Sequence, residues 1–380
     1  MWIRGGCSAS SVAANLTFFP PDPCYKIVER EGVLQMELEA FLDAELVEGT
    51  GITIEVYKVR TRARNVIPIV LYRRAEARYT IIYSHGNATD IGAMHDRYCG
   101  IALHLGVNVV GYDYSGYGAA TGRPSEKNVY LDMRAVYDWA LQSLCGGAAD
   151  GHGLPGGGPA MTAAEAEAAE AAAGGAGGLV AVAANGNGNG KGSSRGDRGS
   201  GARRKGRGVG SCNSGGIAAK GRRLPVNCAH GLILYGQSVG SGAACYMAAV
   251  GSVAGLILHS PILSGMRVLT ESRALACFDI FPNIDRIGAA GCPVTVFHGL
   301  QDEEVHWSHG QQLFAAVPAR DRREPWWCVD RGHNDMCLGR SDEYHRRLAN
   351  FVASLDAPPV VGAAASAVSA AVSATTAAES

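Results

Sequence analysis

The chain alternates apolar segments of strand length with segments of helix length, and this alternation restricts the fold more than any other feature. Apolar runs long enough for buried strands occur at residues 79–84, 107–112, 231–236, 255–259, 294–298 and 326–330. Segments with the apolar spacing of helices occur at residues 92–105, 128–144, 238–250, 308–317 and 342–355. Strands that are apolar throughout suit a sheet covered on both faces. The pattern therefore predicts an α/β domain with a doubly wound, mostly parallel sheet, led by a hairpin at residues 52–60 and 66–73.

Two stretches of low complexity interrupt or follow this pattern. One is rich in Gly, Ala and Arg, and the other contains mostly Ala, Ser, Val and Thr, so neither offers enough apolar surface to form a core. We expect a disordered insert and a disordered C-terminal tail. The expected organisation is an N-terminal segment and possible tether (1–15), the first part of the domain (16–145), the insert (146–225), the second part of the domain (226–356) and the tail (357–380).

Charge and cysteine content restrict the function classes. The formal net charge is -1, which argues against a protein whose main role is to coat nucleic acid. Residues 185–223 contain ten Lys or Arg against one Asp, but no interleaved aromatic residues for base stacking, so nucleic acid is not an expected partner. The 11 cysteines form no C-x-x-C pair and no zinc-site spacing, so we expect neither disulfides nor a metal. No apolar run reaches membrane-span length and no secretory leader is evident, which predicts an intracellular soluble protein.

The pattern Gly-x-Ser-x-Gly, which surrounds the nucleophile of α/β-hydrolases, occurs at 236–240 and again at 192–196. A nucleophile elbow needs a strand before the serine and a helix after it. Only Ser238 has both, because Ser194 lies within the insert. Ser238 is therefore the expected nucleophile.

A serine hydroxyl needs a histidine as general base and an acid that orients the histidine, in the chain order Ser, Asp, His in this fold class. Asp302 follows the apolar run at 294–298, at the strand end where catalytic groups of parallel sheets gather, and is the expected acid. Its neighbours Glu303 and Glu304 are the competing candidates. His333 follows the last strand and a glycine and is the expected base, with His306 and His309 as alternatives.

Acyl transfer also needs N–H groups that stabilise the oxyanion. One is expected from Val239, directly after the nucleophile, and the other from Asn87 in the loop after the strand 79–84, with Ala88 as second choice. The glycine-containing loop that begins at Asp113 is expected to be a structural brace beside the pocket.

Several segments together resemble a known family: 83–88 (YSHGNA), 112–118 (YDYSGYG), 124–128 (PSEKN), 234–238 (LYGQS), 259–267 (HSPILSGMR), 278–285 (FDIFPNID) and 332–335 (GHND). They closely resemble the α/β-hydrolase domain-containing protein 17 family over about residues 16–355, without the insert. The resemblance implies an α/β-hydrolase fold and a cytosol-facing serine hydrolase that removes S-linked palmitate from membrane-attached proteins. The family's three catalytic positions fall on Ser238, Asp302 and His333.

The chain departs from that family in two places. Family members begin with a cluster of cysteines that become palmitoylated, whereas the first twenty residues here contain only Cys7, the candidate for lipidation. One acylated cysteine gives only marginal membrane binding, so we expect a cytoplasmic protein that is partly peripheral on the cytosolic face of membranes. The insert is also foreign to the family pattern.

The sequence thus predicts a Ser-His-Asp acyl-enzyme mechanism without metal or organic cofactor, acting on S-palmitoylated membrane-attached proteins. A carboxylesterase or lipase acting on oxygen esters would use the same residues. A non-catalytic receptor or scaffold with this fold is the alternative from another class. Only about 25 residues separate the strand 255–259 from the next expected helix, too few for a large lid. Met266, Phe278 and Phe281 in this segment are the candidates for acyl binding.

Overall fold

The computed structural model describes residue 14 and residues 17–38, 49–144, 231–269 and 279–356. The expected insert, the expected tail and Cys7 lie outside the described residues. No helix within the described ranges is long and apolar enough to cross a membrane.

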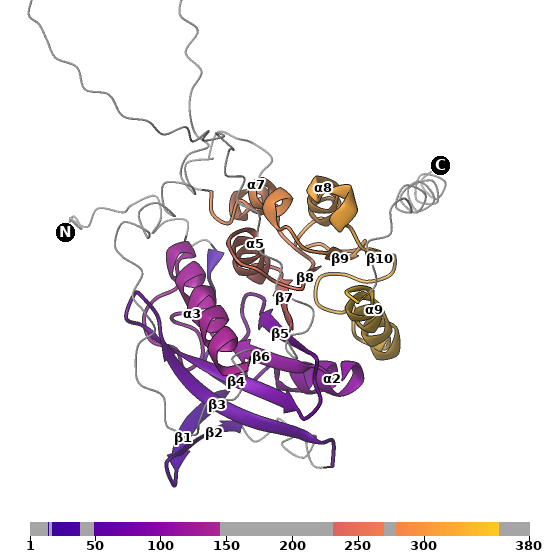
Figure 1. The fold of residues 1–380 in the computed structure, drawn as a ribbon. Helices are drawn as coiled ribbons and strands as arrows, with labels where there is room; N and C mark the ends of the chain where they lie inside the picture. The colour runs from indigo at the N-terminus through magenta and orange to yellow at the C-terminus, as the bar shows by residue number, and fades with distance from the viewer. Residues whose placement is uncertain (1–13, 15–16, 39–48, 145–230, 270–278, 357–380) are drawn as a thin grey trace, which may run out of the picture. The chain divides into compact units, whose positions relative to one another are not determined.

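An eight-stranded sheet forms the centre of the described chain, in the order β10-β9-β8-β7-β5-β6-β4-β3 (Figure 1). Its strands are β3 (Ile52–Arg60), β4 (Val66–Arg74), β5 (Tyr79–Ser84), β6 (Asn108–Tyr112), β7 (Gly231–Gln237), β8 (Gly255–His259), β9 (Val294–Gly299) and β10 (Trp326–Cys328). The six strands from β5 to β10 pair in parallel, while β3 and β4 form an antiparallel hairpin whose β4 pairs with β6. This arrangement confirms the predicted doubly wound, mostly parallel sheet with its leading hairpin.

Helices cover both faces of the sheet, as the apolar strands require. On one face lie α3 (Glu126–Leu144), α5 (Gly240–Val250) and α8 (Ser308–Ala316), and on the other lie α2 (His95–Leu105) and α9 (Ser341–Ser354). Short elements complete the described part: α6 (Gly265–Leu269), α7 (Asn283–Arg286), η3 (Ile287–Ala289) and η4 (Ala319–Asp321). Each face has its own apolar core, so the strands between them are buried on both sides.

A second, two-stranded sheet was not expected from the sequence. It consists of β1 (Tyr25–Arg30) and β2 (Val33–Leu38), joined by Glu31 and Gly32, which have φ values of 53° and 78°. Positive φ at both central residues is the backbone of a tight hairpin turn, for which a two-residue loop ending in glycine is a recognisable signal. The charged residues in these strands conceal the alternation that would have predicted them.

The strand register places the ends of the parallel strands at one edge of the sheet. Ser84 pairs with Gly236, Gln237 with His259, and Gly299 with Cys328. The loops that follow these strands therefore meet at this edge. They carry all the residues expected in the Ser-His-Asp arrangement and in the oxyanion site.

Candidate active site

Ser238 occupies a sharp turn between the end of β7 and the start of α5. Its φ of 51° is left-handed, a conformation that costs energy for a residue with a side chain. The two flanking glycines are needed because the chain is crowded here. A Cβ on Gly240 would lie 2.2 Å from the carbonyl oxygen of Ser84, and one on Gly236 would lie 2.7 Å from Cβ of Ala244. This strand, turn and helix have the geometry of a nucleophile elbow.

The structure brings Ser238, His333 and Asp302 into one hydrogen-bonded line, here called the Ser–His–Asp group. Nε2 of His333 lies 2.9 Å from Oγ of Ser238, and Nδ1 of His333 lies 2.7 Å from Oδ2 of Asp302. A carboxylate oxygen can only accept, so Nδ1 carries the proton and Nε2 is free to accept the serine proton. This is the arrangement that activates a serine hydroxyl.

Asp302 is buried and its carboxylate is held by donors on both oxygens. Oδ1 accepts the N–H groups of Glu304 at 3.0 Å and Val305 at 2.7 Å. Burial opposes ionisation, but hydrogen bonds from His298 and His333 outweigh it and hold the pKa of Asp302 below its usual value. The group is therefore an anion that orients His333.

The competing candidates for the acid do not occupy the position of Asp302. Glu303 is exposed, and Glu304 accepts a hydrogen bond from Asn334 at 2.9 Å. Oε2 of Glu304 lies 3.8 Å from Nε2 of His333, on the side of the ring away from Asp302 Oδ2. Neither glutamate bonds the ring nitrogen that faces Asp302.

The competing histidines also have other partners. His306 is exposed and its Nδ1 lies 2.8 Å from Oγ of Ser308. His309 is buried and its Nδ1 accepts the N–H of Leu263 at 3.2 Å. Burial lowers the pKa of His309 to about 4, so its ring is neutral at pH 7.

The two N–H groups expected to face an oxyanion belong to Asn87 and Val239. Within the described ranges, neither N–H donates a hydrogen bond to the protein. The loop that carries Asn87 lies beside the nucleophile, since a Cβ on Gly86 would lie 3.8 Å from Cβ of Ser238. Ala88, the second choice, has a left-handed φ of 50°.

No family model matches the chain. Among curated proteins it is 31% identical to α/β-hydrolase domain-containing protein 17B of Xenopus laevis, over 90% of this chain and 91% of that one. It is also 31% identical to human α/β-hydrolase domain-containing protein 17B, over 90% of each chain. The chain belongs to the α/β-hydrolase domain-containing protein 17 family. This confirms the resemblance inferred from the sequence, and with it the α/β-hydrolase fold.

Other similar proteins have lower sequence identity to this chain. A Caenorhabditis elegans α/β-hydrolase domain-containing protein is 29% identical over 90% of this chain and 78% of its own length. Among solved structures, an esterase of Pyrococcus furiosus is similar with a TM-score of 0.49 and 12% identity, covering 80% of this chain and 93% of that one. An esterase of a Rhodococcus species is similar with a TM-score of 0.45 and 14% identity, covering 79% and 99% of the two chains.

In this family member the loop at Asp113 braces the site, as its sequence suggested. Asp113 accepts the N–H of Ile91 at 3.0 Å and the hydroxyl of Tyr25, and it lies 3.3 Å from Nε2 of the buried His85. Gly118 is required here, because a Cβ at this residue would lie 1.9 Å from a carboxylate oxygen of Asp113. These contacts join the β1–β2 hairpin, which contains Tyr25, to the loop that carries Asn87.

The acyl-binding candidates have different surroundings. Met266 lies on α6 and is partly exposed, while its N–H donates to Asp279 at 2.8 Å. Phe281 is fully buried, and its ring packs so closely on α5 that a Cβ on Gly242 would lie 2.3 Å from it. Phe281 therefore takes part in core packing, and Phe278 lies outside the described residues.

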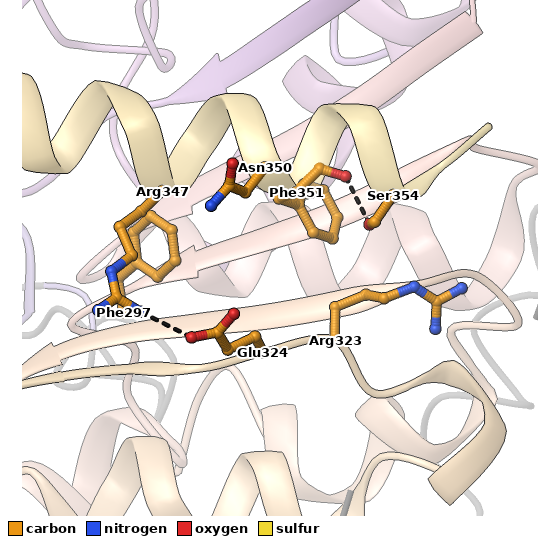
Figure 2. A pocket seen from close by; sticks show the side chains of 7 residues that line it. All are labelled: Phe297, Arg323, Glu324, Arg347, Asn350, Phe351 and Ser354. Atoms are coloured by element: carbon orange, nitrogen blue, oxygen red, sulfur yellow. Dashed lines mark hydrogen bonds and ion pairs between the residues drawn. The ribbon is translucent and has the colours of Figure 1, made fainter. Parts of the chain in front are cut away.

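A small pocket of about 110 Å³ lies elsewhere, between α9 and the edge of the sheet formed by β9 and β10 (Figure 2). Its lining residues are Phe297, Arg323, Glu324, Arg347, Asn350, Phe351 and Ser354. Arg347 and Glu324 pair across it at 3.0 Å, so its charges partly neutralise each other. None of these residues belongs to the Ser–His–Asp group. The described chain also holds no group of three or more His, Cys, Asp or Glu side chains arranged for a metal ion.

Sequence reasoning missed two side chains that support the site. His298 is the next-to-last residue of β9, and the apolar run predicts only a strand there, although its Nε2 lies 3.0 Å from Oδ2 of Asp302. The side chain of Asn87 forms hydrogen bonds with Thr17 and Phe19, whereas the sequence predicts a role for its backbone N–H alone. The position of His298 four residues before Asp302 was an available signal, but nothing local marked Asn87.

Proposed function

We propose that this protein is a serine hydrolase that removes long-chain acyl groups, S-linked palmitate in particular, from membrane-attached proteins. The observation that carries the proposal is the hydrogen-bonded line from Ser238 through His333 to Asp302, at 2.9 Å and 2.7 Å, in a member of a hydrolase-fold family. This arrangement supports acyl transfer, because a histidine that accepts the hydroxyl proton turns a weak serine nucleophile into a strong one.

The first half of the reaction transfers the acyl group to the enzyme. Oγ of Ser238 attacks the thioester carbonyl while Nε2 of His333 takes its proton, and the charge on the former carbonyl oxygen is met by the N–H groups of Asn87 and Val239. When the carbon–sulfur bond breaks, His333 gives the proton to the leaving thiolate. Asp302 stabilises the imidazolium throughout and does not itself take a proton.

The second half releases the fatty acid. Nε2 of His333 removes a proton from a water molecule, whose oxygen attacks the acyl carbon of the acyl-Ser238 ester. The same two N–H groups stabilise the second oxyanion. Collapse of this intermediate returns the proton to Oγ and regenerates the enzyme, so the net reaction consumes one water and needs no cofactor.

A long acyl chain on a protein substrate needs an apolar surface near Ser238 and an uncovered leaving-group side. The short segment after β8 supports such a surface, because it carries apolar residues that include the partly exposed Met266. Family membership supports the same substrate class. Cys7, outside the described residues, is the proposed lipid attachment site for peripheral contact with the membrane that holds the substrates.

The test compares hydrolysis of a palmitoyl-cysteine thioester peptide with that of the matching palmitoyl-serine ester. Wild type is expected to prefer the thioester, and Ser238→Ala and His333→Ala should each lose about 10⁴-fold or more in kcat/KM, because the group acts as a unit. Ser194→Ala is the matched control, since it alters the other Gly-x-Ser-x-Gly sequence, and should retain full activity. Preference for the oxygen ester would indicate an esterase or lipase. Absence of any Ser238-dependent turnover or fluorophosphonate labelling would indicate a receptor or scaffold.

A further inference from the structure

A second histidine, besides His333, contacts the proposed acid. His298 lies at the end of β9 and is fully buried. Its Nε2 lies 2.9 Å from the carbonyl oxygen of Val305 and 3.0 Å from Oδ2 of Asp302. This Oδ2 is the same oxygen that accepts the hydrogen bond of His333 at 2.7 Å. Two imidazole rings therefore share one carboxylate oxygen.

The partners of His298 determine its tautomer. A carbonyl oxygen and an ionised carboxylate are both acceptors, so Nε2 must carry a proton between them. Nδ1 is buried and has no hydrogen-bond partner in the described chain. Packing fixes the ring, since a Cβ on Gly310 of α8 would lie 2.5 Å from Nδ1. His298 is thus a fixed N–H donor rather than a second proton shuttle.

We propose that His298 is a positioning residue that holds Asp302 in the orientation His333 needs and limits how strongly Asp302 binds the His333 imidazolium. The inference rests on the proposed role of the Ser–His–Asp group. The N–H groups of Glu304 and Val305 donate to Oδ1, and the two histidine rings contact Oδ2. The carboxylate therefore has little freedom to rotate. The N–H of His298 also stabilises negative charge on Oδ2, and this competes with stabilisation of a proton on His333.

Competition at Oδ2 has a measurable consequence for the base. Without the His298 donor, Asp302 becomes a stronger acceptor for Nδ1–H of His333, and the protonated form of His333 gains stability relative to the neutral form. The acidic limb of the pH dependence of kcat/KM reports this change, because only neutral His333 can take the serine proton. A purely structural role for His298 would lower activity without moving this limb.

Other titratable and charged groups lie around the two rings. The variants that test the proposal must leave these groups unchanged. Those facing them from β8, α8, α6, α2 and the neighbouring loops are His259, His309, His306, Arg267, Arg97 and Glu304. Burial holds the pKa of His259 well below its usual value and that of His309 at about 4, so neither changes charge near neutral pH. Glu304, 3.8 Å from Nε2 of His333, is the one acid besides Asp302 within ion-pair distance of the His333 ring in the described chain.

The experiment uses a matched pair of amide variants on the full-length protein. In His298→Gln the side-chain N–H reaches about as far as Nε2, whereas in His298→Asn the same amide stops near the position of Nδ1. We measure kcat/KM for a short soluble p-nitrophenyl ester from pH 5 to 9. We expect His298→Asn to shift the acidic limb upward by roughly half a pH unit to one unit, and to lower the plateau on the order of 10-fold. In His298→Gln, the pH of the acidic limb and the height of the plateau should both lie close to the wild-type values.

A limb that stays at the wild-type pH in folded His298→Asn would overturn the proposal, as would a His298→Gln variant no better than His298→Asn. If His298→Asn does not fold, ¹⁵N NMR of the wild-type histidines decides, because the proposal requires neutral His298 with its proton on Nε2. An Nδ1–H tautomer would refute it. The short ester separates this inference from the substrate proposal: loss of thioester preference leaves the His298 result unaffected, whereas absence of Ser238-dependent turnover removes the proposed function itself.

Discussion

The side-chain amide of Asn87 donates a hydrogen bond of 2.6 Å to the carbonyl oxygen of Thr17, 70 residues earlier in the chain. Its Oδ1 accepts the N–H of Phe19 at 3.0 Å and the hydroxyl of Tyr117 at 2.6 Å. Between these bonds Phe18 is buried, with its ring edge-on to those of Tyr117 and Phe281. The loop proposed to supply an oxyanion donor is therefore fastened to the N-terminal segment that leads back toward Cys7.

We expect Asn87→Ala to uncouple these parts while leaving the backbone N–H in place. Loss of three hydrogen bonds should lower the free energy of unfolding by about 2–3 kcal/mol, and a looser loop should lower kcat on the order of 10-fold. Denaturant unfolding and ester kinetics measure the two effects. Phe19→Ala, which removes a 57% exposed side chain from the same segment, should change neither. If Asn87→Ala were destabilised but kept wild-type kcat, the side-chain hydrogen bonds of Asn87 would not position the loop for catalysis.

The second prediction concerns the crowded turn at Ser238. We expect Gly240→Ala to abolish most activity and to cost about 1–3 kcal/mol or more of stability, because the new Cβ would lie 2.2 Å from the main-chain oxygen of Ser84, which cannot move aside cheaply. Thermal unfolding and fluorophosphonate labelling measure these losses. Gly288→Ala is the matched control, since the nearest atom to its new Cβ is 3.7 Å away and its φ is not left-handed. Near-normal labelling of Gly240→Ala would contradict the close approach.

The third prediction concerns stability against pH. His309 is only 8% exposed, and burial lowers its folded-state pKa to about 4, below an unfolded value near 6.5. The unfolded chain therefore binds the proton more tightly, so the stability contributed by neutral His309 is present above pH 6.5 and is lost as the pH falls toward 4. After allowance for solvent screening, we expect this one group to contribute about 2 kcal/mol of that loss.

His309→Asn tests this assignment because the Asn side-chain oxygen can replace Nδ1 as acceptor for the N–H of Leu263 without titrating. The free energy of unfolding of the variant should fall less steeply than that of wild type between pH 6.5 and 4. Parallel curves for the two proteins would show that His309 does not titrate in this range.

Much of the fold and the Ser–His–Asp group could be predicted because each depends on local signals. An apolar run followed by Gly-x-Ser-x-Gly and a helix specifies the Ser238 turn, and the ends of parallel strands place Asp302 and His333 at the same edge. The contacts of Asn87 with Thr17 could not be predicted, since they join distant segments through a side chain that any loop tolerates. The contact of His298 with Asp302 had one signal in the sequence, its position four residues earlier, but a histidine near the end of a buried strand resembles other core residues until its distance from Oδ2 is known.

The last prediction concerns how the reaction rate depends on acyl length. If α6 contributes to an acyl groove, each additional buried methylene adds roughly 0.8 kcal/mol of binding, so kcat/KM of wild type should rise as the chain lengthens from about eight to sixteen carbons. Met266 is the test residue because it is partly exposed on α6, whereas Phe281 is buried in the core and its substitution would unfold the segment. Met266→Asp should flatten the rise and spare short esters, because a carboxylate in the groove opposes only the chains that reach it. Leu103→Asp, which places the same charge at a 43% exposed position of α2, should keep the wild-type slope. A wild-type preference for acetyl or butyryl esters would argue instead for a general carboxylesterase whose α6 has no part in substrate binding.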